Sequence, residues 1–139
     1  MKRKKILSAI LILGIIGAFV AYKIYNKPHV NVANSKADIS LSANKILKDF
    51  SSDENDANTK YLEKIIEVKG EIASLKTEKG LGIISLKTND DFGSVLCHLS
   101  EESTKKMHNF KEGQTISVKG ICTGYLMDVI LVKSEILTN

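Results

Sequence analysis

The sequence predicts a mainly β domain with added helices, built around a closed barrel of five strands. Five short stretches in the second half of the chain alternate apolar and polar residues, which is typical of strands with one buried face. A stretch with a serine start and an acidic first turn, typical of a capped helix, separates the third strand from the fourth. Three strands, a helix and two strands is the order of the OB fold, which we therefore expect here.

The strands are expected at residues 65–75, 81–88, 94–99, 115–123 and 128–136, and the helix at 100–110 with Ser100 as its N-cap. In the first strand Ile66, Val68 and Ile72 should face the barrel interior, because they point to the same side of a strand. Gly70 interrupts this row and predicts a sharp bend of the strand.

A helical extension should precede the barrel, over residues 42–64. Ser42 is placed to cap its start, and Ser52 is placed to cap a second turn. An apolar stripe at helical spacing consists of Ile46, Leu47 and Phe50.

The fifth strand is apolar on both faces. Val129 and Leu131 should enter the interior. Ile130 and Val132 should then face outward. Leaving either side chain exposed to water would lose roughly 1.5–3 kcal/mol of stabilisation from its burial. We expect the apolar stripe of the helical extension to cover them. The alternative is an exposed apolar patch for a partner protein.

The N-terminus predicts a single-pass cell-membrane protein. Residues 6–22 contain no charge and are just long enough to cross about 30 Å of hydrocarbon. Lys23, Tyr25 and Lys27 fit the far interface. The four positive charges before the span predict a cytoplasmic N-terminus and an extracytoplasmic domain, either periplasmic or extracellular. The expected segments are a tail at 1–5, the anchor at 6–22, a juxtamembrane linker at 23–40 and the OB-fold domain with its helical extension at 41–139.

Two alternatives to an uncleaved anchor remain open. A cleaved signal peptide would have the same charged start and apolar core, but cleavage after Ala21 would place the bulky Phe19 at the third position before the cut. A lipoprotein would need a cysteine soon after the apolar run, and none follows it there.

The charge of the soluble part disfavours nucleic-acid binding. After residue 27 the chain has 14 basic and 16 acidic residues, and its single arginine, Arg3, precedes the apolar run. Single-stranded nucleic-acid sites combine a basic groove with stacking aromatic rings. The barrel sequence offers few such rings: Phe92, Phe110 and Tyr125.

Cys97 and Cys122 fall on strands three and four, with both side chains expected in the interior. Outside the cytoplasm they could form a disulfide, which would stabilise the domain by about 2–4 kcal/mol. Strands three and four are not hydrogen-bonded neighbours in an OB barrel, so the bond would have to cross the interior. A disulfide and two buried thiols both remain open.

No pattern in the sequence predicts catalysis, a bound metal or a cofactor. His29, His98 and His108 are scattered over the linker, a strand and the helix. The acidic run at 53–56 lacks the glycine and the final glutamate of a calcium loop. There is no catalytic triad, P-loop or Cys-x-x-Cys motif. We therefore expect a binding protein and not an enzyme.

Two classes of function fit an OB barrel, whose ligand face lies between the loops that join strands one and two and strands four and five. The first is an envelope binding module for a peptide, an oligosaccharide or an envelope protein. The second is single-stranded nucleic-acid binding on the same face. Asp128 could instead hold its own turn through local hydrogen bonds. The candidate ligand-binding residues are Lys76, Lys79, Lys87, Tyr125 and Asp128.

Two motifs are distinctive: D-E-x-x-A-N-x-K-Y at residues 53–61 and G-x-C-x-G-x-x-x-D-V-x-L at residues 120–131. With the stretches ISLKT and VLCHL, they make residues 41–136 resemble the tRNA-anti-like family of OB-fold proteins from the bacterial envelope. Family members often carry a further cysteine after the last leucine, in the neighbourhood where this chain has Ser134. The resemblance implies an OB fold with a nucleic-acid-binding ancestry, and it implies no particular activity.

Overall fold

The computed structural model describes residues 1–26 and 30–138 and divides the chain into two units, Met1–Val30 and Asn31–Asn139. Two expectations, Lys27 at the membrane interface and His29 in the linker, lie outside the described residues. The first unit consists mainly of one helix, α1 (Lys2–Tyr25), which takes in the charged tail as well as the predicted span. Its 24 residues rise about 36 Å, and the helix is long and apolar enough to cross a membrane.

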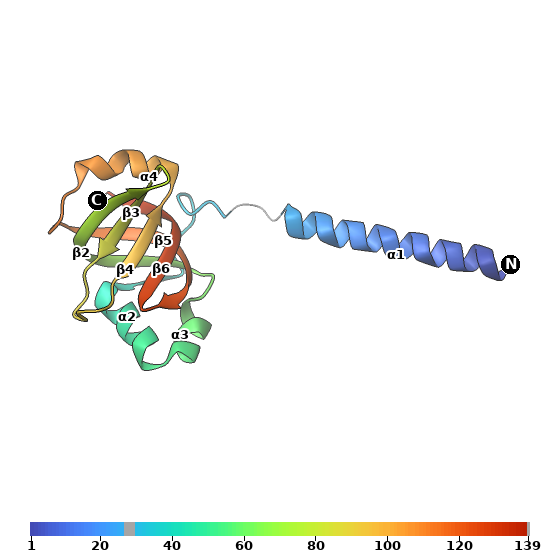
Figure 1. The fold of residues 1–139 in the computed structure, drawn as a ribbon, viewed down its shortest axis with the longest axis horizontal. Helices are drawn as coiled ribbons and strands as arrows, with labels where there is room; N and C mark the ends of the chain where they lie inside the picture. The colour runs from blue at the N-terminus through green and yellow to red at the C-terminus, as the bar shows by residue number, and fades with distance from the viewer. Residues whose placement is uncertain (27–29, 139) are drawn as a thin grey trace. The chain divides into compact units, whose positions relative to one another are not determined.

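The second unit contains a closed barrel of five strands, which confirms the predicted fold class (Figure 1). The order around the barrel is β2, β3, β4, β6 and β5, and β5 pairs with β2 to close it. Neighbours are antiparallel except for β4 and β6, which run parallel. The strands are β2 (Ile65–Glu78), β3 (Leu81–Leu86), β4 (Val95–Leu99), β5 (Thr115–Leu126) and β6 (Asp128–Leu137).

Strand β2 pairs with two different strands along its length. It pairs with β5 as far as Glu71 and with β3 from Ile72 onward. Gly70 lies beside this change of partner, where the sequence predicted a bend. A Cβ atom at Gly70 would lie 3.0 Å from the Cβ of Ala43, the first residue of helix α2 (Ala43–Ser52). The missing side chain therefore also lets the helix approach the strand.

A sixth strand that the sequence did not predict, β1 (Ile39–Ser42), pairs in parallel with the first part of β2. The predicted linker, residues 23–40, is thus structured at both ends, because α1 continues to Tyr25 and β1 begins at Ile39. The stretch between α1 and β1 is therefore shorter than the predicted linker.

The segment before β1 is also attached to the barrel. Val32 is buried. The buried Lys119 of β5 donates hydrogen bonds from Nζ to the carbonyl oxygens of Ala33, at 3.3 Å, and Ser35, at 2.7 Å. The chain therefore joins the barrel domain well before the predicted boundary at residue 41.

Helices cover the two ends of the barrel (Figure 1). At one end lie α4 (Glu101–Lys106) and the 3-10 helix η1 (Met107–Asn109). A Cβ atom at Gly82 of β3 would lie 2.7 Å from the sulfur of Met107, so a larger residue there would require the Met107 side chain to move. At the other end lie α2 and α3 (Glu54–Tyr61).

The apolar stripe of α2 is buried, but it covers the end of the barrel and not the outside of β6. Leu47 lies against Gly93, and Phe50 stacks on Tyr125. Ile130 and Val132 stay half-buried on the outside of β6, apart from the hydrophobic core. The interior side chains of all the strands meet at the barrel end, so a short helix buries more apolar surface there than on one strand.

Two of the predicted helix caps are confirmed and one is wrong. Ser42 caps α2 and Ser100 caps α4 through their hydroxyl oxygens. Ser52 is instead the last residue of α2, and Asp53 caps α3 by accepting a hydrogen bond from the backbone N–H of Asp56. A carboxylate at this position also interacts favourably with the helix dipole.

Candidate ligand-binding face

The outside of β3, β4 and β6 carries apolar side chains that the core does not bury. The strand register places Ser85, Leu96 and Ile130 side by side across the three strands. It also places Ile83 of β3 beside His98 of β4. All five residues are half-buried and alternate with buried ones. We call these five residues the outer face.

The outer face ends in a shallow depression of about 300 Å³ at the β2–β3 turn. Lys79 and Gly80 form this turn with φ of 51° and 81°, a left-handed pair that suits a tight hairpin. Lys76 pairs with Ile83 and so lies on the same side of the sheet. The depression is lined by Glu78, Lys79, Leu81, Ile83 and His98.

The structure divides the five predicted ligand-binding residues between the two ends of the barrel. Lys76 and Lys79 lie at the β2–β3 turn, beside the outer face. Lys87, Tyr125 and Asp128 lie at the opposite end, where β3 leaves the sheet and β5 turns into β6. The five residues are therefore not brought together at one point.

Tyr125 and Asp128 are held by contacts within the domain. The Tyr125 ring stacks on Phe50 at 5.5 Å between centroids. One carboxylate oxygen of Asp128 accepts hydrogen bonds from the backbone N–H of Ser94, at 2.7 Å, and from its hydroxyl, at 2.8 Å. Asp128 thus joins the β5–β6 turn to the β3–β4 loop instead of bracing its own turn.

Sequence reasoning placed Ile130 on the outside of its strand but did not extend the outer face to β3 and β4, although the signal was present. Once the strands at 81–88 and 94–99 are predicted, alternation assigns Ile83, Leu96 and His98 to the outside. The choice of loop lysines rested on charge and overlooked these half-exposed positions.

A larger groove, of about 490 Å³, lies between α2 and the β3–β4 loop. The side-chain oxygen of Asn44 accepts a hydrogen bond of 2.6 Å from the backbone N–H of Asn89, which holds the loop to the helix. Lys48, Asp91 and Phe92 all line the groove, and Phe92 is 81% exposed.

The two cysteines are buried thiols and form no disulfide. Cys97 and Cys122 are both paired with Leu131 of β6, one from each side. They therefore lie two strands apart, roughly 9–10 Å between Cα atoms, which exceeds the reach of a disulfide. Burial raises the pKa of Cys97 to about 12 and also raises that of Cys122, so neither is a ready nucleophile.

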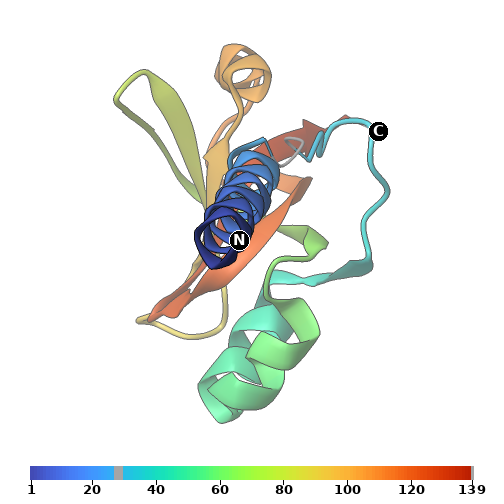
Figure 2. The same cartoon turned by 90° about the vertical axis from the view of Figure 1, so that its right-hand side faces the viewer.

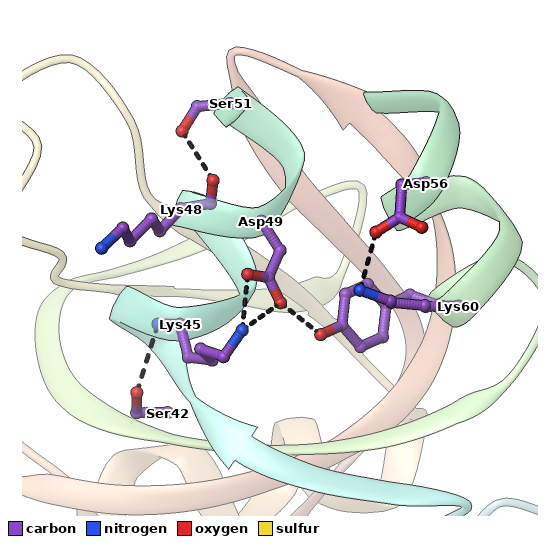
Figure 3. Close-up of polar contacts among 8 residues, drawn as sticks. Ser42, Lys45, Lys48, Asp49, Ser51, Asp56 and Lys60 are labelled. Carbon is purple, nitrogen blue, oxygen red and sulfur yellow. Dashed lines mark hydrogen bonds and ion pairs between the residues drawn. The ribbon is translucent and has the colours of Figure 1, made fainter. Parts of the chain in front are cut away.

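The acidic motif at residues 53–61 organises the helices (Figure 3). Lys45 contacts Asp49 at 2.6 Å, and the Tyr61 hydroxyl donates to the same carboxylate at 2.5 Å. Burial together with this hydrogen bond raises the pKa of Tyr61 to about 12. Lys60 pairs with Asp56 at 2.7 Å on the exposed side of α3. The motif therefore caps α3 and joins it to α2, and these contacts assign it no ligand.

Within the described residues, no group of three or more His, Cys, Asp or Glu side chains is arranged to hold a metal ion. The outer face offers apolar contact, one imidazole and flanking ammonium groups. Such a surface can bind an apolar segment with some charge selectivity.

A five-stranded closed barrel with a helix between its third and fourth strands is an OB fold, so the chain is an OB-fold protein with an N-terminal apolar helix. The chain belongs to the tRNA_anti-like family, whose model matches residues 1–136. No curated protein matches it.

Solved structures of similar fold include two that cover most of this chain. A "putative nucleic acid-binding lipoprotein" from Klebsiella pneumoniae superposes with a TM-score of 0.61 at 15% identity, over 80% of this chain and 99% of that one. A "putative aspartyl-tRNA synthetase" from Leishmania major has a TM-score of 0.50 at 12% identity, over 88% of this chain and 26% of that one. At such low identity these similarities concern the fold.

Proposed function

We propose that this protein is a membrane-anchored extracytoplasmic binding module that takes an apolar peptide or protein segment on its outer face. The observation that carries the proposal is the group of half-buried apolar side chains on the outside of β3, β4 and β6: Ile83, Leu96 and Ile130. An OB barrel binds its ligands on this part of its surface.

The anchor supports an extracytoplasmic location. The tail before the span carries four positive charges, and the chain from residue 28 onward carries a small excess of acid. Basic residues beside a first span favour the cytoplasmic side, so the barrel would lie outside the cytoplasm. A protein, a peptide or an oligosaccharide is the usual ligand class in that compartment.

The rim of the outer face supplies charge selectivity. Lys76 and Lys79 stand at its edge, and Glu78 is the acidic residue of the depression. Rim charges of this kind steer partners and select their sign more than they add affinity. The composition favours an apolar segment with acidic neighbours.

Single-stranded nucleic-acid binding is the second candidate, supported by the name of the Klebsiella relative and by Lys76 and Lys79. Against it, the described outer face contains no Phe, Tyr or Trp ring, the usual platforms for base stacking. We also propose a binding role in place of an enzymatic one, because burial leaves both thiols protonated and His98 faces away from Cys97.

The test uses the full chain in cell membranes, with a photo-crosslinking amino acid at Ile83 and, as the control, at Thr115. Thr115 is an exposed residue of β5 outside the outer face. We expect protein adducts from position 83 that position 115 does not give, weakened by Leu96→Asp. Equal adducts from both positions would contradict the proposal.

A second measurement separates the two candidates. The detergent-solubilised chain is titrated into fluorescent single-stranded DNA and RNA, and anisotropy is followed at low and moderate salt. We expect no binding at either salt. Binding that weakens steeply with salt would support the nucleic-acid candidate, because phosphate contacts release counterions.

A further inference from the structure

A second exposed apolar surface lies at the opposite end of the barrel from the depression. Phe92 of the β3–β4 loop is 81% exposed, and Leu126 and Met127 of the β5–β6 turn are 80% and 64% exposed. We call these three residues the apolar tip. Large side chains this exposed on adjacent loops are unusual without a partner.

The two loops of the apolar tip are fixed to one another. Asp128 accepts both hydrogen bonds from Ser94, and the backbone N–H of Val129 donates to the Ser94 carbonyl at 3.0 Å. A Cβ atom at Gly93 would lie 3.0 Å from the carbonyl oxygen of Met127. The tip is therefore held in place before it meets a partner, which lowers the entropy cost of binding.

Acidic groups accompany the tip. Asp90 and Asp91 directly precede Phe92 and are exposed, and Lys48 is the one basic residue among those that line the groove. An excess of carboxylates disfavours insertion into an anionic lipid surface. It favours a partner with an apolar depression and a basic edge.

The outer face of this same protein has that chemistry. The depression at the β2–β3 turn contains Leu81, which is 41% exposed, together with Ile83 and His98. Lys76 and Lys79 supply two positive charges at its edge, against the single carboxylate of Glu78.

The tip of one copy cannot reach its own depression. Ile83 is level with His98 near one end of β4, whereas Val95 at the other end is level with Val129 beside the tip. Figure 2 shows the β2–β3 hairpin and the β5–β6 turn at opposite ends of the barrel. A contact between the two surfaces must therefore join two molecules.

We propose that the apolar tip of one copy docks into the outer-face depression of a second copy, with Asp90 and Asp91 beside Lys76 and Lys79. The contact uses two different surfaces, and we expect it to repeat head to tail, with the free tip of each copy docking on the next. The contact is small and weak in dilute solution, and attachment to one membrane raises the effective concentration of its partners. This inference rests on the proposed function, because it names the protein that occupies the outer face.

Cysteine crosslinking of the full chain in membranes tests the contact. One copy carries Asp91→Cys and a differently tagged copy carries Lys79→Cys. Both native cysteines are fully buried and should not react. We expect a disulfide-linked pair containing both tags when the two variants are co-expressed, and little pairing when each is expressed alone. A contact between like surfaces would instead link each variant to itself and would overturn the inference.

Two controls define the surfaces. In the first control, the copy with Asp91→Cys is exchanged for a copy with Glu54→Cys. Glu54 is also an exposed acidic residue but lies outside the tip, so the mixed pair should disappear. Phe92→Ser should reduce the mixed pair roughly thirtyfold, the effect of losing an aromatic anchor worth about 2 kcal/mol. Phe92 is exposed, so its replacement leaves folding intact.

Charge reversal separates a direct contact from an indirect effect. Asp90→Lys with Asp91→Lys should weaken the pairing, monitored by the photo-crosslinker at Ile83, and Lys76→Glu with Lys79→Glu on the partner should restore it. Failure of rescue, or the absence of mixed pairs, overturns this inference. If the photo-crosslinker at position 83 then gives adducts with a different protein, the proposed function stands. Only a second copy as the occupant of the outer face is then excluded.

Discussion

Asp49 illustrates how one side chain joins two helices. Burial works to raise its pKa, but the hydrogen bonds from Lys45 and Tyr61 outweigh burial, and the pKa lies below its ordinary value of 3.8. A lowered pKa means that the charged form stabilises the folded state. This stabilisation is complete above the ordinary pKa and is lost as pH falls through the lowered one.

We therefore predict that Asp49→Asn lowers the free energy of unfolding by roughly 1 kcal/mol at neutral pH, and that the deficit shrinks below about pH 4. Urea unfolding of the detergent-solubilised chain measures both values. Asp56→Asn is the matched control, because its pair with Lys60 is exposed on both sides and such pairs contribute little. A deficit that stays constant with pH would contradict the assignment.

Two fully buried serines form a natural comparison. The Ser103 hydroxyl donates to Glu135 at 2.6 Å and accepts from the Ile136 N–H at 3.0 Å. Ser134 is equally buried, and its hydroxyl has no hydrogen-bond partner among the described residues. An unsatisfied buried hydroxyl is costly, whereas a satisfied one contributes to stability.

Ser134→Ala should accordingly raise the free energy of unfolding or leave it unchanged, within about 1 kcal/mol. Ser103→Ala should lower it by about 1–3 kcal/mol, because the Glu135 carboxylate and the Ile136 N–H each lose a partner. Thermal unfolding of both variants under identical conditions gives the comparison. Equal losses would show that Ser134 has a partner in solution.

At the scale of elements, Lys119 binds the segment before β1 to the barrel through hydrogen bonds. Its buried ammonium group donates to two carbonyl groups of residues 33–35, and Val32 is buried nearby in sequence. Lys119→Met keeps the apolar stem and removes the donor. We predict faster hydrogen exchange at Ser35 and the adjoining amides, with the ladder of β5 little changed.

Lys36→Met is the control for this prediction, because Lys36 lies in the same segment and is exposed. Hydrogen exchange measured by mass spectrometry on peptides covering residues 31–42 distinguishes the two variants. If they exchange alike, Lys119 does not hold the segment.

The five barrel strands and the capped helices were predictable because each has a local signal: alternation, a capping side chain or a turn residue. β1 was missed because four residues between a polar segment and a helix carry too little pattern, and its stability comes from parallel pairing with β2. The position of α2 was also missed. The apolar stripe of α2 was identified. The surface that the stripe covers depends on where β1 ends and α2 begins.

For the whole molecule, we predict that the full chain remains membrane-bound after alkaline washing and is released by detergent. α1 is long and apolar enough to span, and an uncleaved chain would keep its full mass of 15.3 kDa. Fractionation and intact-mass measurement test this, with a chain lacking residues 2–25 as the control. A soluble, shorter mature form would indicate signal-peptide cleavage.

The sequence by itself determined the barrel, its helix order and the apolar N-terminal helix, since each follows from periodicity, length and charge along a continuous stretch. Only the tertiary structure decided which surfaces those elements present. It separated Lys79 from Lys87 and placed Leu131 between the two cysteines. It also left Ile83 half-buried at one end of the barrel and Phe92 exposed at the other. The reason is that ligand surfaces and disulfides depend on distances between strands far apart in the chain, and local patterns contain no such distances.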